Sequence, residues 1–339
     1  MLTRADQDLL DGVLAAPGEG QRRAIAKAIT LLESRRADHR ARADELLTAL
    51  PAPARASFRL GVSGVPGVGK STFIETLGLL LTGQGLRVAV LAVDPSSSIS
   101  GGSILGDKTR MERLSVEPAA FVRPSPSGGT LGGVATATRE AIRVVEAAGY
   151  DVVVVETVGV GQSEAAVAGM TDMFVLLQLP NAGDDLQAIK KGVIELADLV
   201  VVNKADIDAA ATTRAVAQIA SALQLVARRG EGPTAPRVLS TCALAADQVA
   251  EVWRAIATFR AAQEQGGAFH ERRRGQSLAW LWERVDAGLR DAFRSHPQVR
   301  AQLDDTLAAV DSGKLPVSVA ARRLLAAFGA HAAAAPLAT

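Results

Sequence analysis

The sequence contains a single cysteine, Cys242, and few aromatic side chains, which make up only 4% of its 339 residues. One cysteine cannot form a disulfide within the chain, and this fits a reducing compartment. Hydrophobic residues nevertheless reach 48%, which is ample for a sizeable core. With so few aromatic rings, that core must be built mainly from alanine, valine, leucine and isoleucine.

The chain also lacks an excess of charge of either sign. Its 37 basic and 36 acidic residues give a formal net charge of +1, so no electrostatic argument favours a nucleic-acid partner. The first ten residues include Arg4, Asp6 and Asp8 and contain no apolar core of a secretory signal. The longest apolar stretches have the length of strands, far short of the roughly 20 residues of a membrane span. We therefore expect a cytoplasmic protein with no membrane partner.

Hydrophobic periodicity divides the chain into three parts. Residues 1–53 are predicted to be a helical segment that ends at Pro51 and Pro53. In residues 54–262, helical stretches alternate with apolar runs at Phe58–Ser63, Val88–Val93, Asp151–Glu156, Phe174–Leu179, Leu199–Asn203 and Val238–Cys242. Because the runs are apolar at consecutive positions, they suit strands buried on both faces of a parallel sheet. The predicted fold is an α/β domain with a mainly parallel, doubly wound sheet.

Residues 263–339 are predicted to form a C-terminal helical segment. Apolar residues recur there at three- and four-residue spacing, as on an amphipathic helix, at Leu278, Leu281, Val285, Leu289 and Phe293. Further helices are expected over 298–328, around a break at Gly313–Pro316.

A phosphate-binding motif, G-x-x-x-x-G-K-[ST], follows the first apolar run. The residues expected to bind the nucleotide phosphates there are Gly64, Gly67, Val68, Gly69, Lys70, Ser71 and Thr72. Glycines let the backbone wrap around a phosphate, and the N-terminus of the next helix attracts the same anion. Lys70 would reach the β- and γ-phosphates, and the Ser71 hydroxyl would bind Mg²⁺. The alternative is a glycine-rich turn that binds nothing, but an apolar run before the motif and a helical stretch after it argue against that.

A base-binding motif, N-K-x-D, follows the fifth apolar run. The Asp206 carboxylate can accept hydrogen bonds from N1–H and the 2-amino group of guanine, which adenine does not offer in that geometry. Lys204 would pack its stem over the base, and Asn203 would tether the loop. The chain has asparagine only at Asn181 and Asn203, which makes a chance match improbable. The motif therefore predicts GTP and GDP rather than ATP as ligands.

A shorter loop follows the last apolar run. In GTPases a loop at this place donates a backbone N–H to guanine O6, and here Cys242, Ala243 and Leu244 would form it. This motif is weak by itself, because Cys242 could equally be a small buried apolar residue.

The third apolar run ends in an acid, Glu156, followed two residues later by Val158 and Gly159. This arrangement corresponds to the D-x-x-G element of GTPases with Glu in place of Asp, so Glu156 would hold a magnesium-bound water and Gly159 would meet the γ-phosphate. Val160 takes the place of the glutamine that orients water in Ras-like enzymes. An apolar side chain cannot orient water, so slow intrinsic hydrolysis is expected.

Two other loops could respond to the nucleotide. The Gly- and Ser-rich stretches after the second run contain Asp94 and Asp107, which are candidates for the metal site or for positioning the attacking water. Either could instead be a capping or turn aspartate. The segment Asn181–Gly192 follows the fourth run and could also feel the nucleotide state. Its alternative is an ordinary helix N-terminus at which the helix dipole favours acids.

Together these motifs resemble one family, the MeaB/ArgK-type GTPases that act as chaperones of adenosylcobalamin-dependent methylmalonyl-CoA mutase. The segments that carry the resemblance are G-V-P-G-V-G-K-S-T-F, V-D-P-S-S-S, G-G-S-I-L-G-D-K-T-R-M, E-T-V-G-V-G-Q-S-E, N-A-G-D-D-L-Q-A-I-K-K-G and N-K-A-D, which lie between about Gly61 and Asp206. The D-P-S-S and E-T-V-G-V-G-Q-S-E elements distinguish this family from Ras-like GTPases. One departure is Cys242, where serine is usual in GTPases.

The resemblance implies a function and a set of roles. The metal-site and switch positions would be Ser71, Asp94, Asp107 and Glu156, and Lys190 would assist hydrolysis stimulated by the mutase. The C-terminal helices would form a homodimer. The nucleotide state would gate delivery of intact adenosylcobalamin to methylmalonyl-CoA mutase, or to a related mutase, and removal of damaged cofactor.

Three other functions stay open on the sequence. A nickel-insertion GTPase would need soft or imidazole ligands, and the chain has one cysteine and four scattered histidines. A small-molecule or transport-protein kinase would need a base near the acceptor, which Asp94 could supply, although N-K-A-D argues against ATP. A scaffold that binds GTP without useful turnover is compatible with Val160.

Overall fold

The computed structural model describes residues 2–34, 36–53, 55–93, 111–124, 131–157, 163–180, 191–226 and 234–329. The chain divides into two compact units, Met1–Arg273 and Arg274–Thr339. The first unit contains the sheet, the helices that cover it and the helices of the N-terminal segment. In the second, every regular element among the described residues is a helix.

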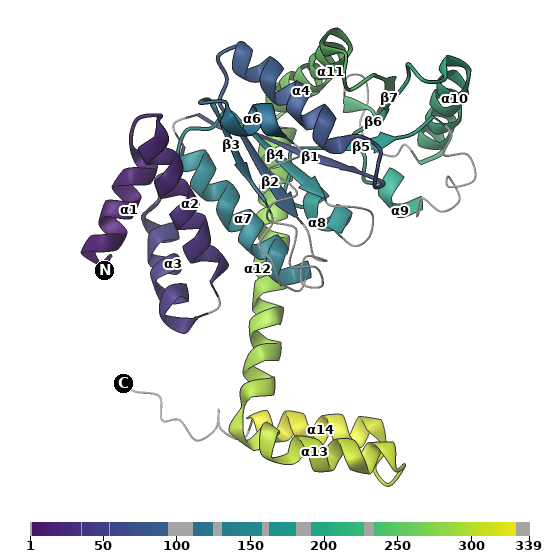
Figure 1. Cartoon of the computed structure of the whole chain (residues 1–339). Helices are drawn as coiled ribbons and strands as arrows, with labels where there is room; N and C mark the ends of the chain where they lie inside the picture. The colour runs from purple at the N-terminus through teal and green to yellow at the C-terminus, as the bar shows by residue number, and fades with distance from the viewer. Residues whose placement is uncertain are drawn as a thin grey trace. The chain divides into compact units, whose positions relative to one another are not determined.

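The first unit is built on a seven-stranded sheet with the order β3-β2-β4-β1-β5-β6-β7 (Figure 1). Every neighbouring pair of strands is parallel. The strands are β1 (Phe58–Gly64), β2 (Val88–Val93), β3 (Ala120–Arg123), β4 (Val152–Thr157), β5 (Met173–Gln178), β6 (Leu199–Val202) and β7 (Arg237–Ser240). The prediction of a parallel, doubly wound α/β fold is confirmed.

The predicted strands differ from the observed ones at the two edges of the sheet. Strands β2, β4, β5 and β6 are buried at every residue, as their unbroken apolar runs predicted. The expectation that the last run is buried on both faces is wrong, because β7 lies at an edge and its first and last residues are exposed. Strand β3, at the other edge, was not predicted. It has only four residues and ends in Arg123, so its apolar run is too short to stand out.

Helices cover both faces of this sheet (Figure 1). The core on one face includes side chains from α4 (Lys70–Gly83), α6 (Glu112–Val116) and α11 (Ala246–Gln265). The core on the other face includes side chains from α7 (Leu131–Ala147), α8 (Ser163–Ala168), α9 (Lys191–Ile194) and α10 (Ala209–Val226). The two faces are therefore filled by alternate residues of each strand, such as Val153 and Val154 of β4.

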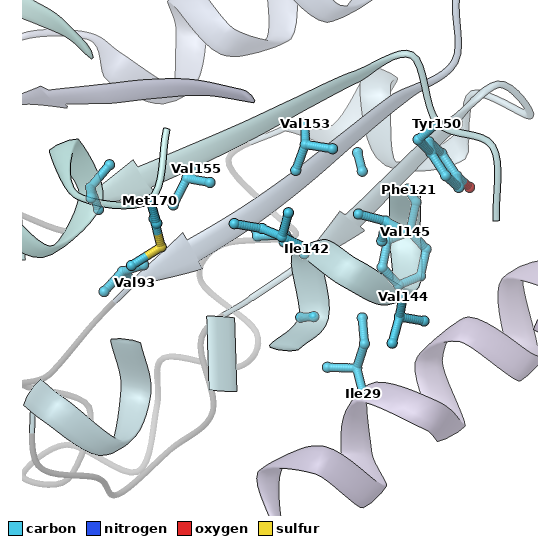
Figure 2. Packing of buried hydrophobic residues seen from close by; sticks show 14 of the residues in the cluster. Ile29, Val93, Phe121, Ile142, Val144, Val145, Tyr150, Val153, Val155 and Met170 are labelled. Carbon is cyan, nitrogen blue, oxygen red and sulfur yellow. The ribbon is translucent and has the colours of Figure 1, made fainter. Parts of the chain in front are cut away.

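The N-terminal helices α1 (Arg4–Leu14), α2 (Glu19–Glu33) and α3 (Ala37–Ala49) extend the core beyond α7. Figure 2 shows Ile142 of α7 near Val153 of the sheet, while Val144, on another side of α7, lies beside Ile29 of α2. Ile29 and Val144 are fully or almost fully buried. Helix α7 is thus apolar on more than one side because it lies between the sheet and α2.

Arginines anchor the first residues of α12 (Ala268–Ser295) to the amino edge of the sheet. Arg273 donates two hydrogen bonds of 2.7 Å to the carboxylate of Asp172, just before β5. Arg272 makes a second pair with Asp198, just before β6, at 2.8 and 3.1 Å. Both acids also accept a backbone N–H of the sheet, so each links the helix to a strand.

A buried carboxylate, Glu146 of α7, joins the same network. Its oxygens accept hydrogen bonds from the Arg59 guanidinium at 2.7 and 2.8 Å and from the Ser57 hydroxyl at 2.6 Å. Burial by itself would raise the pKa of Glu146, but the hydrogen bonds and charges of Arg59 and Arg273, with the Ser57 hydroxyl, outweigh burial and lower it. Glu146 is therefore a charged group held inside the fold.

The second unit continues α12 and adds α13 (Pro297–Asp311) and α14 (Val317–Gly329). Helices α13 and α14 pack together, and the rings of Phe293 and Phe328 lie 5.5 Å apart. The predicted helices and the break between them are confirmed, with Gly313 at a positive φ of 70° in the turn. The apolar residues predicted on α12 are largely exposed in the single chain, at Leu278, Leu281, Val285 and Leu289. Within the described residues, no helix has the length and apolar character needed to cross a membrane.

Candidate functional site

The predicted phosphate-binding loop turns from the end of β1 into α4. Gly67 and Gly69 have φ angles of 78° and 95°, in the left-handed region that side chains rarely adopt. Space is tight as well, because a Cβ on Gly64 would lie 2.6 Å from the carbonyl oxygen of Leu177, and one on Gly69 would lie 2.6 Å from Asn203 Nδ2. At each of these three positions glycine is favoured, either because the φ angle is positive, because a neighbouring atom leaves no room for a Cβ, or for both reasons.

Lys70 begins α4 and reaches back across this loop. Its Nζ donates to the carbonyl oxygen of Gly64 at 2.7 Å and to that of Val65 at 3.3 Å. The side chain is buried, so its charge is held at the loop and is little screened by water. An ammonium group at this point suits a phosphate oxygen, since it is attracted more strongly to a negatively charged acceptor than to a neutral carbonyl.

Ser71 and Glu156 meet at the carboxyl edge of the sheet. The Ser71 hydroxyl donates to Glu156 Oε1 at 3.3 Å, and Glu156 is 7% exposed. A hydroxyl and a carboxylate are the hard oxygen donors that Mg²⁺ prefers, so this pair fits the predicted metal. Asp94 and Asp107, the other predicted ligands, lie outside the described residues. Across the residues that are described, no group of three or more His, Cys, Asp or Glu could hold a metal ion.

Strand β4, which carries Glu156, is also linked by a side-chain contact to β1, the strand that precedes the predicted phosphate-binding loop. The hydroxyl groups of Thr157 and Ser63 lie 2.7 Å apart, and both side chains are fully buried. This contact fixes the end of β4 against the end of β1, which carries the loop. Gly159 and Lys190, the remaining predicted catalytic residues, lie outside the described residues.

Asn203 connects the predicted base-binding loop with the phosphate-binding loop. Its Nδ2 donates to the carbonyl oxygen of Val68 at 2.7 Å, and its Oδ1 accepts the N–H of Ala243 at 2.9 Å. Asn203 is almost fully buried at the end of β6. The tethering role predicted for it therefore has a concrete form, because one amide holds two loops from distant parts of the sequence.

Lys204 and Asp206 complete the N-K-x-D motif on the turn after β6. Lys204 has a φ angle of 59°, which is uncommon for a residue with a side chain and sets the sharp turn after β6. Asp206 is exposed, and within the described part of the chain its carboxylate has no hydrogen-bond partner. A carboxylate that is held on a fixed turn and faces solvent can accept hydrogen bonds from a ligand.

The loop after β7 contains two contacts that the sequence did not predict. The N–H of Cys242 donates to Gln248 Oε1 at 2.7 Å, and the Thr76 hydroxyl donates to the carbonyl oxygen of Ala243 at 2.7 Å. Cys242 and Ala243 are buried, whereas Leu244 is 80% exposed. A hydrogen bond between a side chain and a backbone group distant in sequence leaves no recognisable sequence motif. For Gln248 the one signal in the sequence is its position just after the loop.

The structure thus brings together residues predicted to bind the phosphates and the base, and it describes only part of the predicted switch residues. Lys70, Ser71 and Glu156 form one group, and Asn203 links it to Ala243.

Comparisons with known proteins agree on one family. The family model described as "Methylmalonyl Co-A mutase-associated GTPase MeaB" matches residues 25–298. A "Putative GTPase" of Caulobacter vibrioides is 52% identical over 330 residues, which cover 97% of this chain and all of that protein. The "Methylmalonic aciduria type A homolog, mitochondrial" of Mus musculus is 45% identical over 338 residues, with 96% of this chain and 81% of that protein covered. A crystal structure of a "LAO/AO transport system kinase" has a TM-score of 0.75 and 37% identity, and covers 96% of this chain and 98% of its own.

Proposed function

This chain belongs to the MeaB family of GTPases, and on that premise we propose that it is a GTP-driven chaperone of a cobalamin-dependent acyl-CoA mutase. As a member of that family it binds guanine nucleotides and hydrolyses GTP. The proposed partner is methylmalonyl-CoA mutase or a related enzyme that uses adenosylcobalamin. The nucleotide state would gate loading of intact cofactor and removal of damaged cofactor. The family description and the name of the Mus musculus relative support this partner.

The observation that carries the proposal is the contact between Ser71 and Glu156. It joins the start of α4, at the phosphate-binding loop, to the end of β4, after which the predicted switch begins. A change at the γ-phosphate would therefore act on Glu156 and on the residues that follow it. This is the arrangement that a nucleotide-dependent switch needs.

Each described residue of the site has a role in this proposal. Lys70 binds the β- and γ-phosphates, and Asp206 recognises guanine. Ser71 and Glu156, with Asp94 and Asp107, would hold Mg²⁺, which neutralises phosphate charge when bound. Asn203 holds the phosphate-binding loop and the loop after β7 in fixed positions relative to each other.

Hydrolysis is proposed to be slow until the partner binds. Val160 offers no polar group to orient water, so the chain by itself would turn over slowly. Lys190, in the segment Asn181–Gly192, would assist hydrolysis when the mutase contacts that segment. Gly159 would meet the γ-phosphate through its N–H.

The active form is proposed to be a homodimer made through the C-terminal helices. Large apolar side chains of α12 are exposed in the single chain, including Leu281 at 54% and Trp282 at 64%. A second copy of this chain would cover them and remove apolar surface from water.

The proposal is tested by GTP turnover of the purified chain, alone and with methylmalonyl-CoA mutase and adenosylcobalamin. Slow turnover that rises steeply with the mutase is expected. Turnover that is indifferent to the mutase would overturn the proposed partner and leave the GTPase assignment standing. Bovine serum albumin at the same concentration serves as the protein control.

A further inference from the structure

The loop after β7 uses almost all of its own backbone donors. Within Thr241–Ala245, the N–H of Leu244 is the one without an acceptor among the described residues. The other acceptors are Val202 O for Thr241 at 2.8 Å, Gln248 Oε1 for Cys242 at 2.7 Å, Asn203 Oδ1 for Ala243 at 2.9 Å and Cys242 O for Ala245 at 2.9 Å. A ligand that approaches this loop therefore meets one available amide, next to an exposed side chain.

Three elements of the fold hold the loop in this state. Asn203 directly follows β6, Gln248 lies in the first turn of α11, and Thr76 lies in α4. Asn203 and Gln248 each accept a backbone N–H, and Thr76 donates its hydroxyl to the carbonyl oxygen of Ala243 at 2.7 Å. Each contact satisfies one backbone group of the loop within the protein, so that group is not available to hydrogen-bond a ligand.

We propose that Gln248 and Thr76 are positioning residues of the guanine site, and that they make the Leu244 N–H the donor to guanine O6. The two side chains would act through the loop and would not touch the base. This inference rests on the guanine-nucleotide binding stated above and does not depend on the mutase. It narrows the predicted set of Cys242, Ala243 and Leu244 to one backbone donor.

The physical reason is the cost of a buried amide without an acceptor. Cys242 is 8% exposed, so its N–H has little access to water if Gln248 cannot accept it. The loop would then relax until that N–H finds another acceptor, and the Leu244 N–H would lose its fixed direction. A hydrogen bond to O6 needs a donor held at about 2.9 Å in good alignment, so a small rotation is enough to weaken it.

The test compares GDP with 6-thio-GDP, in which sulfur, a weaker acceptor, replaces O6 while N1–H and the 2-amino group remain. Affinities of the full chain for both nucleotides are measured by calorimetry without any partner protein. Gln248→Met keeps the length of the side chain and removes the acceptor, and Gln248→Glu keeps an acceptor oxygen. Thr76→Val removes the hydroxyl at similar size, with Thr76→Ser as its control.

The wild-type chain is expected to prefer GDP. In Gln248→Met and in Thr76→Val the affinity for GDP should fall about three- to tenfold, as for the loss of one neutral hydrogen bond, while the affinity for 6-thio-GDP falls less. The preference for GDP therefore shrinks in these two variants and is retained in Gln248→Glu and Thr76→Ser.

An unchanged preference in both Gln248→Met and Thr76→Val would overturn the inference. So would an equal loss for the two nucleotides, because that pattern belongs to a side chain with a general structural role. If one variant fails to fold, the other by itself tests the inference, since Thr76 and Gln248 lie on different helices. A mutase that does not respond to the chain would sink the proposed partner and would leave this comparison unaffected.

Discussion

Ser71 and Glu156 are 85 residues apart in the sequence, yet the hydroxyl of one donates to a carboxylate oxygen of the other at 3.3 Å. The contact exists because β4 lies directly beside β1, so the loops at their carboxyl ends meet. It places the residue expected to bind a metal next to the acid expected to complete that site.

Substitution of Glu156 should therefore impair hydrolysis more than binding. In Glu156→Gln we expect kcat for GTP to fall about 100-fold or more, because the neutral amide stabilises neither the metal nor charge in the transition state. GDP affinity measured in EDTA should stay within about threefold of wild type, since the phosphates still meet Lys70. Glu195→Gln, at a residue after α9, is the control. Unchanged kcat in Glu156→Gln would contradict the role of this acid.

Asp206 should set the choice of base. Asp206→Asn loses two charge-assisted hydrogen bonds to guanine, so GTP affinity should fall about 100-fold while XTP affinity rises. Competition with a labelled nucleotide measures both affinities. Asp208→Asn is a matched control, because Asp208 caps α10 through the N–H of Ala211 at 2.9 Å and is not expected to touch the base. Full discrimination against XTP in Asp206→Asn would refute the base-site prediction.

Glu146 should make the fold sensitive to acid. Its pKa lies below the ordinary value of 4.5, since burial, which raises it, is outweighed by Arg59, Ser57 and Arg273. A carboxyl with a lowered pKa in the folded state stabilises the fold above that ordinary value, and the contribution is lost as pH falls through the lowered pKa. The free energy of unfolding of the wild type, measured with urea, should therefore fall progressively below pH 4.5.

The variant that tests this is Glu146→Gln. It should lower the free energy of unfolding at pH 7 by about 1–3 kcal/mol, because Arg59 loses a charged acceptor. Its stability should also depend less on pH in the acid range, by up to about 1.4 kcal/mol per pH unit for one proton. Glu251→Gln changes an exposed ion pair on α11 and should cost less than about 1 kcal/mol. A pH dependence equal to that of wild type would contradict the assignment.

The C-terminal helices should control the oligomeric state. Leu281→Glu combined with Leu289→Glu places charge on two exposed apolar positions of α12, so the proposed homodimer should dissociate to monomers in sedimentation experiments. The single-chain fold should be retained, because neither side chain belongs to the buried core. Arg284→Glu, an exposed charge on the same helix, is the control. Dimers that persist in the double variant would argue against this interface.

Much of the sheet could be predicted because burial leaves a mark on the sequence. Strands β2, β4, β5 and β6 are buried on both faces, and each appears as an unbroken apolar run. The edge strands carry less of that signal. β3 is short and partly polar, and the burial expected for β7 fails because it has a neighbour on one side only.

The sequence predicts candidate site residues where the chemistry needs a fixed residue type at a fixed spacing. Lys70 and Asn203 belong to such motifs. Lys70 Nζ donates to the carbonyl oxygen of Gly64, and Asn203 Nδ2 donates to that of Val68, so both side chains contact the predicted phosphate-binding loop. Gln248 and Thr76 were missed, because a side chain that accepts from or donates to a distant backbone group can have many identities and positions. The fold alone determines which of them meets the loop.

Transfer of adenosylcobalamin to apo-mutase, followed by the visible absorbance of the cofactor, measures whether the nucleotide state gates cofactor loading. Loading should proceed when this chain hydrolyses GTP. It should stall when the chain is held with a non-hydrolysable GTP analogue, and Glu156→Gln should stall it with GTP itself. Loading at the same rate under all three conditions would contradict the claim that this GTPase gates delivery of the cofactor.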